Sequence, residues 1–151
     1  LKFTGRYYIL DKALHTRGLP WVAVDNDRGL LITLDHSKKA NELIFYDIAD
    51  NMKYVGSVKL SETVRSIQGA EMYGGMLYAA TNDDTQAVYK IDPKSGEVSK
   101  YFDRNLTKGS EGEGITVLET ADGAVFHAID MGPLFINAFI RHYAPVEDGG
   151  Q

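Results

Sequence analysis

The amino-acid sequence predicts an all-β chain built from repeated units, and three observations support this fold class. Short runs rich in Val, Ile, Tyr, Phe and Thr fill the chain, and these residue types favour strands. Turn-forming segments, such as residues 25–29 and 92–96, separate the runs because their Asp, Asn, Pro and Gly residues favour tight turns. No segment carries a sustained apolar pattern with the period of an amphipathic helix.

Each run is bounded by turn signals and has the length of an ordinary strand, so we expect twelve strands. The first run stands alone before a long turn-rich stretch, and the others follow one another closely. In chain order the expected strands are residues 6–10, 21–25, 30–35, 42–47, 53–60, 67–73, 76–81, 87–91, 98–102, 115–119, 124–130 and 138–143.

The runs also repeat along the chain. The sequence Gly-Leu-Leu-Ile-Thr at residues 29–33 resembles Gly-Met-Leu-Tyr-Ala at 75–79, and Gly-Ala-Val-Phe-His at 123–127 stands in the same place again. Residues 44–47 match residues 89–92 in the same way. The spacing is close to the ~40–50 residues of a four-stranded β-propeller blade. A β-sandwich would also give many short strands, but it lacks the repeat, so we favour the propeller.

The whole chain, residues 1–151, is therefore expected to be a partial β-propeller. A single strand at residues 6–10 precedes a four-stranded blade at 21–60, a second blade at 67–102 and a three-stranded blade at 115–143. These strands make three four-stranded blades' worth, whereas closed propellers typically have four to eight blades. The ring is predicted to be incomplete.

Two interpretations of the incomplete ring stay open. The chain is a piece of a longer propeller whose missing blades belong to the same polypeptide, or a second copy of the chain completes a six-bladed ring. In the second case each copy lends residues 6–10 to the last blade of its partner. The start at Leu1 without a methionine favours the first interpretation.

Composition limits the partners of the chain. The formal net charge of −5 argues against a nucleic-acid partner, which requires clustered Lys and Arg. No apolar run is long enough to span a membrane, and the absence of cysteine excludes disulfides and thiol catalysis. The tripeptide Asn105-Leu106-Thr107 predicts a glycosylation site at Asn105 if the protein is secreted.

Several motifs resemble those of a known group of proteins. Residues 19–25 (Leu-Pro-Trp-Val-Ala-Val-Asp), 67–71 (Ile-Gln-Gly-Ala-Glu) and 111–117 (Glu-Gly-Glu-Gly-Ile-Thr-Val) resemble blade openings in a family of secreted β-propeller proteins without an assigned activity. They are more distantly similar to NHL-type, YncE-like and SMP-30/gluconolactonase-like propellers and to the esterase-like domain named after phytase. The resemblance implies a secreted or extracytoplasmic location and further blades before Leu1.

The blade openings supply the candidate ligand-binding residues. The first strand of each blade lines the central channel of a propeller, which predicts Trp21, Gln68, Glu71 and Glu113 on the channel rim. Their carboxylate and amide oxygens suit a hard cation such as Ca²⁺ or the hydroxyl groups of a small-molecule ligand. The favoured alternative is structural: the polar side chains bond backbone groups where blades meet, and Trp21 fills space between blades.

Acidic residues near the ends of strands extend the candidate metal site. Asp83 and Asp130 follow the second strands of two blades, so Glu71, Asp83, Glu113 and Asp130 are the candidate calcium ligands. The favoured alternative is turn chemistry, in which Asp bonds its own backbone.

Two classes of function follow from the sequence. The first is a ligand- or partner-binding propeller, because catalytic residues stay unassigned: no Gly-x-Ser-x-Gly elbow or His-Glu-x-x-His pair occurs. The second, implied by the lactonase-like resemblance, is a calcium-dependent hydrolase of lactones or esters, in which the cation polarises the substrate carbonyl and activates water.

Overall fold

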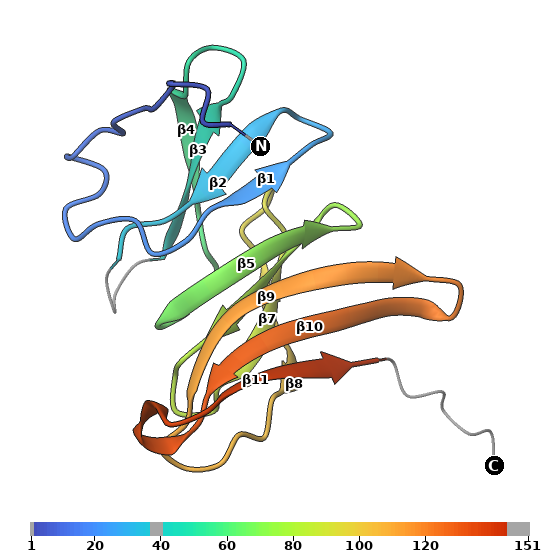
Figure 1. Cartoon of the computed structure of the whole chain (residues 1–151). Coiled ribbons are helices and arrows are strands. Elements are labelled where there is room, and N and C mark those ends of the chain that lie inside the picture. Colours follow the sequence, from blue (N-terminus) through green and yellow to red (C-terminus); the bar gives the residue numbers. More distant parts are fainter. Residues whose placement is uncertain (1, 37–40, 145–151) are drawn as a thin grey trace.

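The computed structural model describes residues 2–36 and 41–144, and there the chain forms three antiparallel β-sheets in succession (Figure 1). The first two sheets have four strands each and the third has three, and neighbouring strands in each sheet are consecutive in the chain. The first sheet contains β1 (Ala23–Asp25), β2 (Leu30–Thr33), β3 (Glu42–Asp47) and β4 (Lys53–Lys59); the second contains β5 (Ile67–Tyr73), β6 (Met76–Thr81), β7 (Ala87–Ile91) and β8 (Val98–Asp103); the third contains β9 (Glu111–Thr120), β10 (Gly123–Met131) and β11 (Ala138–Tyr143).

Most predicted strands are confirmed, and β3, β5, β6, β7 and β11 begin and end at the expected residues. The largest difference is at β9, which begins at Glu111 instead of residue 115. Glu111 and Gly112 pair with Met131 and Asp130 of β10, so pairing with a long neighbour overrides the weak strand preference of a Gly-rich stretch.

The strand predicted at residues 6–10 is expected to pair with a further blade or a second copy, and within the single chain this segment forms no strand. Tyr7 and Ile9 are 77% and 80% exposed. A strand is stabilised by hydrogen bonds to a neighbouring strand, and none of the described strands pairs with this segment.

Helical structure is limited to one 3-10 turn, η1 (Pro133–Phe135), in the part of the chain that the structure describes. No helix there is long and apolar enough to cross a membrane.

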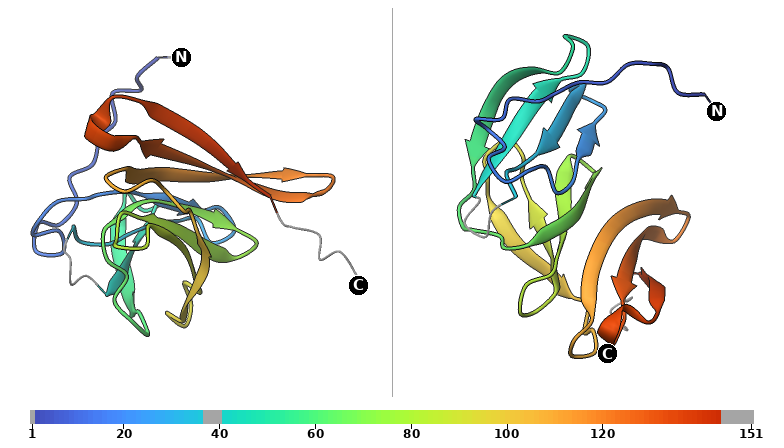
Figure 2. Two further views of the ribbon diagram at one scale, coloured as in Figure 1. Left: turned by 90° about the horizontal axis from the view of Figure 1, so that it is seen from below. Right: turned by 60° about the vertical axis from the view of Figure 1, so that its left-hand side comes forward.

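The three sheets repeat at a constant interval. Their first strands, β1, β5 and β9, begin at residues 23, 67 and 111, so each sheet starts 44 residues after the previous one. β5 contacts both β1 and β9, and Figure 2 shows the sheets stacked in an open arc. The chain therefore folds as an incomplete β-propeller, as predicted, and not as two facing sheets of a sandwich.

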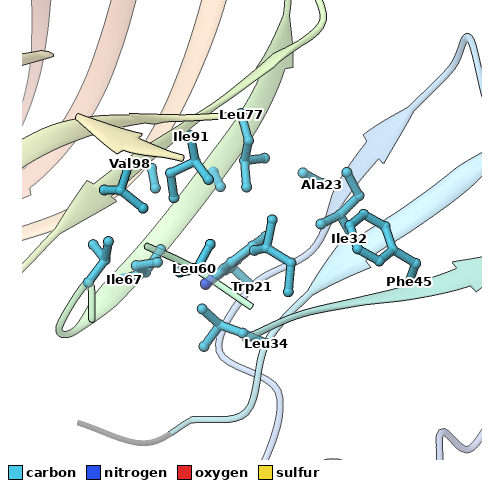
Figure 3. Packing of buried hydrophobic residues seen from close by; sticks show 14 residues of the cluster. Trp21, Ala23, Ile32, Leu34, Phe45, Leu60, Ile67, Leu77, Ile91 and Val98 are labelled. Carbon is cyan, nitrogen blue, oxygen red and sulfur yellow. The ribbon is translucent and has the colours of Figure 1, made fainter. Parts of the chain in front are cut away.

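An apolar cluster joins the first sheet to the second. Figure 3 shows the Trp21 ring lying among Ile32 and Leu34 of the first unit, Leu60 at the end of that unit and Ile67 at the start of the second. The cluster also includes Ala23, Leu43, Phe45, Val64, Ala70, Leu77, Ala79, Ile91 and Val98.

A second cluster joins the second sheet to the third. Successive residues of a strand point to opposite faces, so Leu77 of β6 packs in the first cluster while Tyr78 packs in the second. There Tyr78 contacts Phe126 of β10, with ring centroids 4.9 Å apart. The middle sheet is therefore apolar on both faces and covered on both.

The segment that precedes β1 covers part of the outer face of the first sheet. His15 Nε2 lies 2.7 Å from the hydroxyl of the buried Tyr46, and the backbone N–H of Arg17 donates to the carboxylate of Asp35. Tyr46 neighbours Phe45 in β3 and so points away from the first cluster.

The backbones of β5 and β9 approach each other closely at one pair of glycines. A Cβ atom at Gly69 would lie 2.7 Å from the Cα of Gly114, whereas a Cβ at Gly114 would meet open space. Close packing of the second sheet on the third therefore requires glycine on one side only.

We predict that Gly69→Ala destabilises the protein by about 1–3 kcal/mol, because β5 and β9 must move apart to accept the methyl group. Gly114→Ala is the matched control, since it has the same effect on the unfolded chain but meets no atom in the folded one. Denaturant unfolding measures both, and equal losses for the two variants would contradict the predicted close contact.

Candidate functional site

A buried arginine connects the second sheet to the third. Arg104 follows β8 directly, and its side chain has no exposed surface. Its Nε donates to the carbonyl of Gln86 at 2.9 Å, and one terminal nitrogen donates to the carbonyl of Thr81. The other terminal nitrogen donates to Asp130 Oδ1 at 2.9 Å. The guanidinium therefore ties the end of β6, the loop after it and β10 together.

Asp130 is shared between two arginines. It lies at the irregular end of β10, it is fully buried, and its second oxygen accepts a hydrogen bond of 2.7 Å from Nε of Arg141. The ion pair between Asp130 and Arg104 is buried from solvent. The Arg141 side chain is 39% exposed, so its ion pair with Asp130 is partly accessible to solvent. Burial lowers the pKa of the Arg104 guanidinium, and the charge of Asp130 opposes this change.

The neighbouring backbone is shaped around this ion pair. A Cβ atom at Gly112 would overlap the Arg104 guanidinium, so any other residue at this position of β9 would push the guanidinium away from its partners. The backbone N–H of Gly112 also donates to the side chain of Asn82 at 3.4 Å. The same place between the first two sheets holds the buried Leu60, which stands 44 residues before Arg104, so one junction is apolar and the other is charged.

The predicted rim residues lie at the strand edges of this junction. Gln68 and Glu71 are on β5 and Glu113 is on β9, and all three are partly buried. Burial raises the pKa of Glu71. Burial also raises the pKa of Glu113, with a further rise from the charge of Glu111 and an opposing effect of Arg104. Both carboxyls therefore keep their protons to a higher pH than an exposed glutamate does, and they stand on strands of different sheets.

Two of the four candidate calcium ligands, Asp83 and Asp130, form hydrogen bonds or ion pairs with other side chains. Asp83 accepts hydrogen bonds from the backbone and hydroxyl of Thr85, both 3.1 Å, and from the Tyr89 hydroxyl at 3.0 Å, which is turn chemistry. These bonds hold the pKa of Asp83 below its usual value although burial acts the other way. Asp130 is occupied by its two arginines. Within residues 2–36 and 41–144 no three His, Asp or Glu side chains form a group that could hold a metal ion.

Of the remaining predicted site residues, Trp21 is buried and Asn105 is exposed. Trp21 is 6% exposed in the first cluster, so its ring fills space between sheets and is not open to a ligand. Asn105 is exposed in the connection between β8 and β9, so its amide is accessible to modification. Its glycosylation and the extracytoplasmic location stay predictions.

No sequence pattern indicates the role of Arg104 or Arg141. A single arginine after a strand is usually a solvated residue, and its burial depends on the third sheet packing over it. Gly112, next to Glu113 in the chain, marks the site, because there is no room for a side chain beside the Arg104 guanidinium.

The outer face of the third sheet is apolar and uncovered in the described part of the chain. Ile129 and Ile140 are cross-strand partners, so they share this face, and Ile140 is 67% exposed. A hollow of about 380 Å³ lies on this face. Its lining residues are Gly114, Ile115, Thr116, His127, Ile129 and Ile140.

A scan against protein-family models finds no match, and a search of curated proteins finds no significant relative. Among solved structures, the chain is similar to hydrazine synthase of Kuenenia stuttgartiensis, with a TM-score of 0.57 and 16% identity over 83% of this chain and 33% of that one. It is also similar to the extracellular domain of a protein described as a one component system from B. thetaiotaomicron, with a TM-score of 0.50 and 11% identity over 85% of this chain and 15% of that one.

A third similar structure is the β-propeller domain of Swd1 from Myceliophteria thermophila, with a TM-score of 0.44 and 15% identity over 75% of this chain and 36% of that domain. The chain thus spans between 15% and 36% of the length of these three solved chains. These similarities concern the fold alone.

We predict that Asp130→Asn destabilises the protein by about 3–5 kcal/mol, because it leaves the Arg104 charge buried without its partner. Arg141→Gln is the control and should lose only about 1 kcal/mol, since that side chain reaches solvent. Combining Arg104→Met with Asp130→Leu should restore much of the stability that Asp130→Asn loses. Unfolding free energies measure all three variants, and a loss for Arg141→Gln as large as that for Asp130→Asn would contradict this assignment.

Proposed function

We propose that the chain is a non-catalytic section of a β-propeller that acts as a binding scaffold, and that its partner is a further propeller-type β-sheet. The observation that carries the proposal is the uncovered apolar face of the third sheet. The sheet is buried on its other face, where Ile115 and Phe126 pack against the second sheet.

The repeat supports this partner. The middle sheet carries apolar side chains on both faces and has a neighbour on each. The third sheet has the same alternation but a neighbour on one face only, so a further sheet would continue the stack. Fully burying one Ile or Leu side chain contributes about 1.5–3 kcal/mol. Exposed Leu118, Ile129 and Ile140 together therefore favour association strongly.

The form of the surface favours a macromolecular partner over a small molecule. A small-molecule site is a concave pocket with a few convergent polar groups. The hollow on the third sheet is lined mainly by Ile115, Ile129 and Ile140, and only Thr116 and His127 bring polar side-chain atoms to it. It lies on a broad apolar sheet face, which is typical of a packing surface.

We predict that Ile140→Glu weakens self-association or partner binding at least about tenfold, because a carboxylate would be buried in an apolar interface. Val55→Glu is the matched control, since Val55 is 50% exposed on β4, away from this face. Sedimentation velocity at increasing concentration measures the effect. A concentration-dependent increase in mass that Ile140→Glu leaves unchanged would contradict the proposal.

The calcium-dependent hydrolase stays a prediction without support from the geometry of the four candidate acids. If Ca²⁺ binds the folded protein, it raises the free energy of unfolding. The gain is about 2.7 kcal/mol when the Ca²⁺ concentration is a hundred times the Kd. That gain would raise the melting temperature by several degrees. Thermal melting in Ca²⁺ and in EDTA measures it, with Glu71→Gln and Glu113→Gln as variants that should remove the shift. Equal melting temperatures would exclude such a site.

A further inference from the structure

The outer edge of the third sheet differs from those of the other two sheets. Its strand order is β11-β10-β9, so β11 pairs with β10 on one side and with no described strand on the other. The first and second sheets continue at this place with β4 and β8. One position for a fourth strand is therefore open beside β11.

An aromatic hollow of about 390 Å³ lies at this open edge. It is lined by Tyr101 and Phe102 of β8, Phe126 of β10, and His142 and Tyr143 at the end of β11, with Ala144. Phe102 contacts Tyr143, with ring centroids 4.8 Å apart, so the rings bridge the two sheets beside the hollow.

The corresponding place between the first two sheets is filled by an outer strand. Val58 of β4 packs on the first cluster, and the backbone N–H of Ser61 donates to the carbonyl of Gly96 at 2.8 Å. The Ser61 hydroxyl in turn accepts a hydrogen bond from Val98 of β8. The end of the first sheet's outer strand, β4, thus contacts the start of the second sheet's outer strand, β8. The hollow between β8 and β11 is the place where a fourth strand of the third sheet would make the same contact with β8.

Residues 6–10 have the properties of the absent strand. Their sequence, Arg-Tyr-Tyr-Ile-Leu, favours a strand, and Tyr7 and Ile9 are largely exposed. The connections at residues 60–66 and 104–110 each join an outer strand to the first strand of the next sheet. By analogy, an outer strand of the sheet that packs on the first sheet should precede β1, and from residues 6–10 it would reach β1 through a longer connection, residues 11–22.

Within one copy this segment lies at the far end of the molecule from β11. Figure 1 shows the N-terminal segment beside the first sheet and β11 at the opposite end of the stack. We infer that the open edge of β11 accepts residues 6–10 of a second copy of this chain as its fourth strand. The inference rests on the proposed function, because the first sheet of that copy would cover the apolar outer face of the third sheet.

Disulfide trapping tests the inference directly, because the chain contains no cysteine. His142→Cys is placed in one preparation, and Tyr7→Cys, Tyr8→Cys or Ile9→Cys in another. Air oxidation of each mixture should give a disulfide-linked heterodimer of twice the chain mass. Side chains alternate across a strand, so position 8 should differ sharply in yield from positions 7 and 9. Lys53→Cys, exposed on β4, replaces His142→Cys in the control mixture.

The outcomes separate this inference from the proposed function. If the heterodimer forms with the alternating pattern, residues 6–10 occupy the edge of β11. If no mixture cross-links, or all positions and the Lys53→Cys control cross-link equally, the inference is wrong. Should the wild-type chain still associate through the face that Ile140→Glu disrupts, the proposed function stands without it. A further variant carries His142→Cys and Tyr7→Cys in the same chain. If it forms a disulfide within one chain while the mixtures form none between chains, the assignment to a second copy is wrong.

Discussion

The structure depends on the covering of apolar sheet faces by neighbouring sheets. Each unit of 44 residues forms a sheet whose strands carry apolar side chains on both faces, and one sheet alone cannot bury both. The second sheet achieves this burial between its two neighbours. The first sheet is partly covered by the segment around His15, and no described residue covers the outer face of the third sheet. The same rule that explains the core therefore leads to the surface that we propose binds a partner.

The two junctions between sheets are built from different chemistry at equivalent places. Leu60 and Arg104 each follow the last strand of their sheet, and both are buried. The Arg104–Asp130 pair adds little net stability over an apolar contact of similar size, but it strongly disfavours any packing that separates the charges. We infer that the ion pair fixes how the third sheet sits on the second, and with it the direction in which its outer face and the β11 edge point.

The fold could be predicted from the sequence because its signals are local. Turn residues and β-favouring runs mark the strands, and a repeat of similar runs marks the blades. The prediction is incomplete where pairing decides: residues 111–114 look like a loop but join β9, and residues 6–10 look like a strand but have no neighbour within the single chain. At the site, sequence reasoning selected acids that could bind calcium. It missed Arg104, because the role of that residue appears only when the second and third sheets are packed together.

Amide hydrogen exchange in the third sheet tests the central claim most directly. If another sheet covers its outer face and edge, exchange in β10 and β11 should slow by tenfold or more as protein concentration rises. Exchange in β6, which is already covered on both faces, should stay constant. Exchange in β11 that is equally fast at all concentrations would contradict the claim that this surface binds a second copy.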